Sequence, residues 1–217
     1  MIPSEPLMPL LMLVTNRHVV SSRHKLLRNI EAAVRGGVDI VQVRENDLPE
    51  SEIRELCKDI KTIANGNSLV IINDRTDIAV SSSLDGVHLT EKSVSPEVAK
   101  RILGSQAFVS GSCHSLGKAL ELFSKGINSL VVGTMFETES HPGKIPEGPE
   151  LVAEIRSHVN CPIIGIGGIT ISNIPKVLKA GATGIAVIRE ILCSADPESV
   201  ARELKMKLNE AVTRIND

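Results

Sequence analysis

Eight short apolar segments recur along the chain, each followed by an amphipathic stretch, and this alternation limits the folds that the sequence can adopt. The segments, rich in Val, Ile and Leu, span residues 10–16, 39–45, 68–74, 85–90, 107–113, 129–136, 162–168 and 183–188. The following stretches repeat apolar residues at i, i+3 and i+4, most clearly at 24–37, 51–65, 118–126 and 199–212. Strands alternating with helices predict a parallel sheet. Eight repeats predict a single (β/α)8 TIM barrel, and we expect one domain over residues 1–217.

A doubly wound open sheet is the alternative, but it usually needs fewer strands, and no G-x-G-x-x-G follows the first apolar segment. Helix-boundary residues agree with the barrel. Pro49 and Pro96 stand where the first turns of helices are expected. Gly104, Gly126 and Gly181 stand where helices are expected to end.

The composition argues against two classes of partner. Lys and Arg total 24 against 26 Asp and Glu, so the chain lacks the basic field that nucleic acids or anionic membranes attract. The apolar segment near the N-terminus is interrupted by Pro9 and is too short to span a bilayer. The four cysteines are widely spaced, without a C-x-x-C pattern, which favours reduced thiols in a cytoplasmic protein. We expect a small-molecule ligand, no nucleic acid or membrane partner, and a possible homo-oligomer.

Polar residues gather where several of the apolar segments end. In a (β/α)8 barrel the carboxyl ends of the strands form the active-site rim. The groups at these ends are Gln42 and Arg44, then Asn73, Asp74 and Arg75, then Ser112 and His114, then Glu137, Thr138, Ser140 and His141. One such group is ordinary loop chemistry, but several on one rim predict a polar pocket.

Three polar residues in or near the apolar segments, Asp74, Arg44 and His88, have competing interpretations. Asp74 is a suitable N-cap for the next helix, although a cap explains one polar residue and not three neighbours. Arg44 lies in an apolar segment and needs an anionic partner, for which Asp74 and a ligand phosphate are the candidates. His88, near the end of the fourth segment, fits a hydrogen-bonded core histidine as well as a catalytic one.

The seventh and eighth segments predict a phosphate site. The seventh ends in Gly167 and Gly168, and glycine lets backbone N–H groups approach an anion. Loops after strands seven and eight of such barrels often bind phosphate. We therefore expect phosphate between Gly167–Gly168 and Ile188–Arg189.

Several motifs taken together resemble the superfamily of thiamine phosphate synthase and the TenI-type thiazole tautomerase. They are QVRE (42–45), INDR (72–75), DGVHL (85–89), S-x-H (112–114), GTMFET (133–138), IGIGGI (164–169) and AGATGIAVI (180–188). The resemblance implies a (β/α)8 barrel that binds a phosphorylated thiazole in thiamine biosynthesis, with Asp74 as a magnesium ligand.

Departures from the synthase pattern point to a weak magnesium site at most, and no cofactor is certain. Asn46 and His141 stand where the synthase has lysines, and Ser93 stands where it has a second magnesium aspartate. The sequence FET (136–138) and the sequence SADP (194–197) favour the TenI-like branch. That branch has an acid/base histidine where this chain has Thr134, so another group must move protons.

The main expectation is thus a TenI-like protein that binds thiazole phosphate and moves protons on it. The alternatives are a synthase joining a pyrimidine pyrophosphate to thiazole phosphate, and a non-catalytic sensor or carrier of phosphorylated thiazole or thiamine. The candidate catalytic residues are His114, His141 and Glu137, and the candidate substrate-binding residues are Gln42, Arg44, Asn73, Asp74, Ser112, Thr138 and Ser140.

Overall fold

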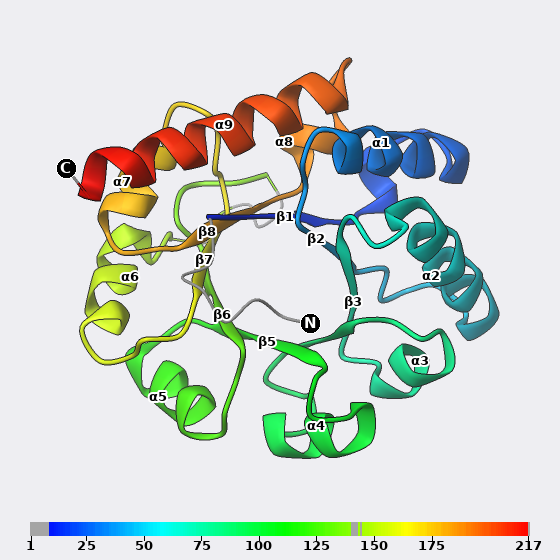
Figure 1. Ribbon diagram of the computed structural model, residues 1–217, viewed down its shortest axis with the longest axis horizontal. Coiled ribbons are helices and arrows are strands. Elements are labelled where there is room, and N and C mark those ends of the chain that lie inside the picture. The colour runs from blue at the N-terminus through cyan, green and yellow to red at the C-terminus, as the bar shows by residue number, and fades with distance from the viewer. Residues whose placement is uncertain (1–8, 140–142, 144, 217) are drawn as a thin grey trace.

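A closed barrel of eight parallel strands forms the centre of the computed structural model, which describes residues 9–139, 143 and 145–216. The strands pair in sequence order, and β8 closes the barrel on β1 (Figure 1). They are β1 (Leu10–Val14), β2 (Ile40–Val43), β3 (Leu69–Asn73), β4 (Gly86–Leu89), β5 (Phe108–Cys113), β6 (Ser129–Gly133), β7 (Ile163–Ile166) and β8 (Gly184–Val187). The predicted (β/α)8 barrel is confirmed, and each strand lies within a predicted segment.

Helices surround the barrel (Figure 1). They are α1 (Arg23–Arg35), α2 (Glu50–Ala64), α3 (Thr76–Ser81), α4 (Pro96–Leu103), α5 (Leu116–Ser124), α6 (Gly148–Arg156), α7 (Ile174–Lys179), α8 (Arg189–Leu192) and α9 (Pro197–Asn216), with a 3-10 turn at Arg17–Val19. Pro96 opens α4, and Gly104 ends it at φ 96°, as the sequence predicts. The short helix α8 was not expected; it directly follows β8.

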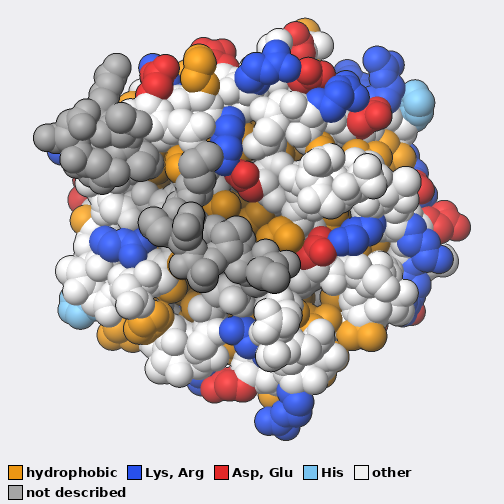
Figure 2. All heavy atoms as spheres, in the orientation of Figure 1, with side chains coloured by type: hydrophobic (Ala, Val, Ile, Leu, Met, Phe, Trp, Pro, Cys, Tyr) orange, Lys and Arg blue, Asp and Glu red, His pale blue; other side chains and the backbone are white. Residues whose placement is uncertain are grey.

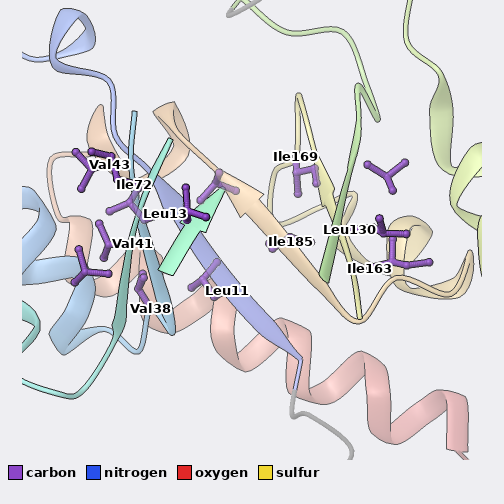
Figure 3. Close-up of a cluster of buried hydrophobic side chains, with 14 of the residues drawn as sticks. Leu11, Leu13, Val38, Val41, Val43, Ile72, Leu130, Ile163, Ile169 and Ile185 are labelled. Atoms are coloured by element: carbon purple, nitrogen blue, oxygen red, sulfur yellow. The ribbon is translucent and has the colours of Figure 1, made fainter. Parts of the chain in front are cut away.

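The core has two apolar layers because successive strand residues point to opposite faces of the sheet. The outer layer fills the space between strands and helices; in Figure 3 its members include Leu11 and Leu13 of β1, Val41 and Val43 of β2, and Ile185 of β8. The inner layer fills the barrel and consists of Leu10, Met12, Val14, Ile40, Ile71, Phe108, Val131, Ile164 and Ala186. Alternation along a strand therefore decides which side chains enter the barrel.

Four polar side chains at the amino-terminal ends of the strands, here named the amino-terminal clasp, fix the pairing of neighbouring strands. Each clasp residue directly precedes an even-numbered strand and accepts a backbone N–H of the preceding odd-numbered strand. The bonds are Leu11 N–H to Asp39 (2.7 Å), Val70 N–H to Asp85 (2.7 Å), Val109 N–H to Asn128 (2.9 Å) and Ile163 N–H to Thr183 (3.0 Å). In each pair the backbone N–H of the clasp residue also donates to the carbonyl of the same partner. Each clasp residue thus holds one strand residue by two hydrogen bonds.

Two clasp carboxylates also form ion pairs. Lys205 of α9 lies 2.7 Å from Asp39, and Lys61 of α2 lies 2.6 Å from Asp85. These contacts tie helices to the base of the barrel. The two lysines and the two carboxylates are all partly exposed. We therefore assign most of the clasp's contribution to stability to its hydrogen bonds and little to these ion pairs.

The surface carries charges of both signs, interspersed on the face shown in Figure 2. In the described part of the chain no helix is long and apolar enough to cross a membrane.

Cys57, Cys113 and Cys161 are buried free thiols, whereas Cys193 is exposed.

The clasp predicts a measurable contribution to stability at Asn128, the neutral clasp amide. Asn128→Ala leaves the Val109 N–H without its acceptor, so we expect the free energy of unfolding to fall by about 1–2 kcal/mol. Asn128→Asp keeps an acceptor, as Asp39 and Asp85 do, and should recover most of that loss. Urea unfolding of the three proteins measures this; equal stability of Asn128→Ala and the parent contradicts the role of the clasp.

Candidate active site

A cavity of about 480 Å³ lies at the carboxyl ends of the strands, above the inner apolar layer. The alternation that points Ile40 and Ile71 into the barrel also carries Gln42, Arg44 and Asn73 inward, two or four residues later. The same register brings Val14, Asn16, His88, Thr90, Ser112, His114 and Ile188 to the cavity wall. The predicted convergence of Gln42, Arg44, Asn73 and Ser112 on one pocket is therefore present.

Gln42 and Asn73 form one polar wall of the cavity. Both are buried, and the Gln42 side-chain amide donates to Asn73 Oδ1 at 3.1 Å. The Asn73 amide in turn donates to Asn46 Oδ1 at 3.2 Å and to Asp74 Oδ2 at 2.7 Å. These bonds orient the amide of Asn73, so the wall is ordered by the protein itself.

Arg44 lines the same cavity and is half-buried. Its backbone N–H donates to Thr15 Oγ1 at 2.9 Å, but its guanidinium forms no ion pair or hydrogen bond with any residue that the structure describes. Of the two partners expected from the sequence, Asp74 is therefore excluded. A half-buried guanidinium facing a cavity has five N–H donors to offer to an anion there.

Asp74 does not line the cavity; its carboxylate turns toward the loop after β4. Oδ1 accepts the backbone N–H of Thr90 at 3.2 Å and its hydroxyl at 2.7 Å, and it also accepts the Ser93 hydroxyl. Oδ2 accepts the Asn73 amide. Helix α3 has no side-chain cap, so Asp74 is not the helix cap that the sequence allowed.

Magnesium, which the resemblance implies, does not fit this arrangement. Protein donors occupy both Asp74 oxygens, whereas Mg²⁺ needs free oxygen ligands in a near-octahedral set. Ser93, at the place of the second aspartate, donates a hydrogen bond to Asp74. Among the described residues no three His, Cys, Asp or Glu side chains form a metal-binding group.

Arg75, the third polar residue of the sequence Asn73–Asp74–Arg75, forms ion pairs outside the cavity. Its guanidinium pairs with Asp77 at 2.6 Å and with Glu50 at 3.0 Å, outside the cavity. These carboxylates hold the pKa of Arg75 above its usual value, chiefly through the Asp77 hydrogen bond. Of the three neighbours, only Asn73 faces the cavity.

His88 connects the cavity to the barrel interior. Its Nδ1 lies 2.9 Å from the hydroxyl of Ser110, and its Nε2 lies 2.8 Å from that of Ser112. Burial of the ring lowers the pKa of His88 to about 4, so the imidazole is neutral near pH 7. The side chain is a hydrogen-bonded core histidine that also reaches the cavity wall.

Two of the three predicted catalytic residues, His114 and Glu137, lie at the cavity. His114, Glu137 and Thr138 line it, whereas Ser140 and His141 lie outside the described residues. His114 Nδ1 contacts the carbonyl of Gly133 and lies 3.6 Å from Glu147 Oε1. Glu147 also accepts the backbone N–H of Thr134. The structure thus adds a carboxylate beside His114.

The predicted phosphate-binding residues form the opposite wall, where Gly167, Gly168, Ile188 and Arg189 meet. The backbone N–H groups of Gly167, Gly168 and Ile188 donate to no acceptor among the described residues. Such free N–H groups suit an anion. Arg189 pairs with Glu139 at 2.7 Å, so its charge is already partly compensated.

Backbone conformation and close packing also require glycine at positions 167 and 168. Gly167 has φ 103° and Gly168 has φ 61°, in the left-handed region. A Cβ on Gly167 would overlap the Thr134 side chain, and one on Gly168 would overlap the carbonyl of Glu137. The glycine pair is therefore needed for the loop after β6 to pack against β7, with or without a ligand.

Several wall residues were missed from the sequence. Asn16, Thr90, Thr134 and Thr170 line the cavity but were not among the candidates. Asn16 and Thr90 lie two residues beyond Val14 and His88 and continue the inward face of β1 and β4 past the strand ends. Counting in steps of two from Val14 and His88 would have found both. Thr134 and Thr170 lie on loops, where this period does not apply.

Similarity to known proteins agrees with the barrel fold. The family described as thiamine monophosphate synthase (TMP-TENI) matches residues 11–191. A thiamine-phosphate synthase of Clostridium tetani is 35% identical over 201 residues, covering 92% of this chain and 96% of the relative. One of Natronomonas pharaonis is 37% identical over 179 residues, covering 81% and 84%. The solved structure of a thiamine phosphate pyrophosphorylase from Pyrococcus furiosus has a TM-score of 0.84 at 30% identity, covering 94% of this chain and 98% of that one. The chain therefore belongs to the thiamine monophosphate synthase family.

Proposed function

We propose that the chain is a thiamine phosphate synthase, which joins a pyrimidine pyrophosphate to thiazole phosphate and expels pyrophosphate. The observation that carries the proposal is the guanidinium of Arg44, which lines the cavity without an anionic partner among the described residues. A departing pyrophosphate develops negative charge, and a guanidinium at the cavity wall stabilises that charge. In this proposal Gly167, Gly168 and Ile188 hold the phosphate of the thiazole on the opposite wall.

The relatives support the synthase over the TenI-like reading favoured by the short motifs FET and SADP. Proteins named thiamine-phosphate synthase match more than four-fifths of this chain at 35–37% identity, whereas those motifs cover only a few residues. The family match does not separate the two branches.

Proton transfer on a thiazole phosphate is the second candidate function. The hydrogen bonds that the Asp74 carboxylate accepts favour it. Protein hydrogen bonds occupy the carboxylate that the synthase pattern assigns to magnesium. His114, with Glu147 at 3.6 Å, provides an imidazole for such a transfer. The same cavity then binds thiazole phosphate without a pyrimidine partner.

One assay series separates these functions. Purified protein is incubated with thiazole phosphate carboxylate and pyrimidine pyrophosphate, with and without Mg²⁺, and thiamine phosphate and the thiazole tautomers are followed. Thiamine phosphate formation supports the synthase. Tautomer exchange without the pyrimidine supports proton transfer. Binding without either reaction identifies a sensor or carrier, and absence of binding overturns the proposed site.

Arg44→Gln tests the proposed anion contact. Loss of the charge should weaken binding of inorganic pyrophosphate at least tenfold, because a charged hydrogen bond to phosphate contributes about 1.5–3 kcal/mol. Arg75→Gln is the matched control, since Arg75 is engaged with Asp77 and Glu50 outside the cavity and should bind as the parent does. Calorimetric titration of the three proteins gives the comparison; similar affinities for Arg44→Gln and Arg75→Gln remove Arg44 from the site.

Ser93→Asp tests the account of magnesium. In the parent, Mg²⁺ alone should bind with a dissociation constant no tighter than the millimolar range, because both Asp74 oxygens accept hydrogen bonds and no three His, Cys, Asp or Glu side chains of the described chain form a metal-binding group. Ser93→Asp removes one of those donors and adds a carboxylate, so Mg²⁺ affinity should rise about tenfold, on the order of 1.4 kcal/mol. Tight binding by the parent, measured by calorimetry without substrate, contradicts this account.

A further inference from the structure

A chain of three side chains leads from the barrel interior to the cavity. Ser110 of β5 is fully buried and contacts Nδ1 of His88, and Ser112, two residues further along β5, contacts Nε2. His88 of β4 is paired with Ser110 in the sheet register, so backbone pairing positions the two side chains. Of these three side chains, Ser112 and His88 reach the cavity, whereas Ser110 does not.

The direction of these hydrogen bonds follows from counting acceptors around Ser110. A buried hydroxyl left without an acceptor is costly, and Nδ1 of His88 is the sole hydrogen-bond partner of the Ser110 side chain among the described residues. Ser129, its register neighbour on β6, has an oxygen that could accept, but that oxygen has no hydrogen-bond partner. The Ser110 hydroxyl therefore donates to Nδ1.

We propose that Ser110 is a positioning residue that holds His88 as the Nε2–H tautomer and thereby makes Ser112 a hydrogen-bond donor to the ligand. When Nδ1 accepts from Ser110, the single ring proton lies on Nε2, and Nε2–H donates to the Ser112 oxygen. The Ser112 hydrogen is then free to point into the cavity. In the opposite tautomer Ser112 would donate its hydrogen to His88 and offer the ligand lone pairs alone.

This arrangement selects a chemical class of ligand. A ligand with an acceptor atom opposite Ser112, such as an unprotonated ring nitrogen or an anionic oxygen, completes the chain of hydrogen bonds. A ligand with an N–H donor at that point loses this bond and faces the Ser112 hydrogen. The neutral state of the buried imidazole keeps the chain in one form around neutral pH. The prediction about the ligand rests on the proposed function, whereas the assignment of the His88 tautomer does not.

Nitrogen NMR of the unliganded protein tests the tautomer directly. The protein is labelled with 15N-histidine, and His88 is assigned by the resonances lost in His88→Gln. We expect a single neutral Nε2–H form, with Nδ1 shifted by the hydrogen bond that it accepts. A predominant Nδ1–H form overturns the proposal.

Ser110→Ala tests the positioning role, with Ser129→Ala as the matched control. Both changes remove a fully buried strand hydroxyl, but the Ser129 hydroxyl has no hydrogen-bond partner among the described residues, His88 included. In Ser110→Ala the Nδ1 resonance should move toward that of a nitrogen without a hydrogen bond, and affinity for thiamine phosphate should fall about two- to tenfold. Ser129→Ala should leave both unchanged. An unmoved resonance, or a moved resonance with unchanged affinity, overturns the positioning role.

The experiment separates this inference from the proposed function. If the parent does not bind thiamine phosphate, the proposed function fails, and the His88 resonances of the parent and of Ser110→Ala then decide the positioning role alone. If thiamine phosphate binds but the tautomer is Nδ1–H, the proposed function stands and the inference fails.

Discussion

Each residue of the amino-terminal clasp joins one odd-numbered strand to the even-numbered strand after it by two hydrogen bonds to a single residue. This double contact sets the register at the base of the barrel, and the parallel ladder carries that register to the cavity. A slip by one residue would exchange the two faces of a strand and turn Gln42 and Asn73 toward the helices. The position of the polar wall therefore depends on contacts at the opposite end of the barrel.

The sequence was sufficient for the architecture and for part of the site. Eight apolar segments with helical stretches between them predicted every strand, and Gln42, Arg44, Asn73 and Ser112 meet as expected. The direction of the Asp74 side chain could not be predicted, because the period of two holds only while the backbone stays extended. Asp74 has φ 60°, a left-handed conformation, and there its side chain leaves the cavity for Thr90.

The interaction partners of charged side chains could not be predicted from the sequence either. Arg44 and Arg75 are the same residue type at the ends of neighbouring strands. Arg44 faces the cavity with no partner in the described part of the chain, whereas Arg75 pairs with Asp77 and Glu50. Glu147, 33 residues after His114 in the sequence, lies beside it only because the start of α6 packs against β6. Such contacts follow from tertiary packing and leave no local pattern.

The close packing of Gly167 and Gly168 against the loop after β6 has a consequence for how this barrel can diversify. The N–H groups of Met135 and Phe136 donate to the carbonyls of Ile166 and Gly167 at 2.9 and 3.0 Å, so the two loops share one backbone framework. Glu137 and Thr138 project from that framework into the cavity mouth. Because backbone atoms make these hydrogen bonds, changes of side chain at Glu137 and Thr138 leave them in place. The chemistry of the cavity mouth can therefore vary while the backbone of Gly167 and Gly168 keeps its shape.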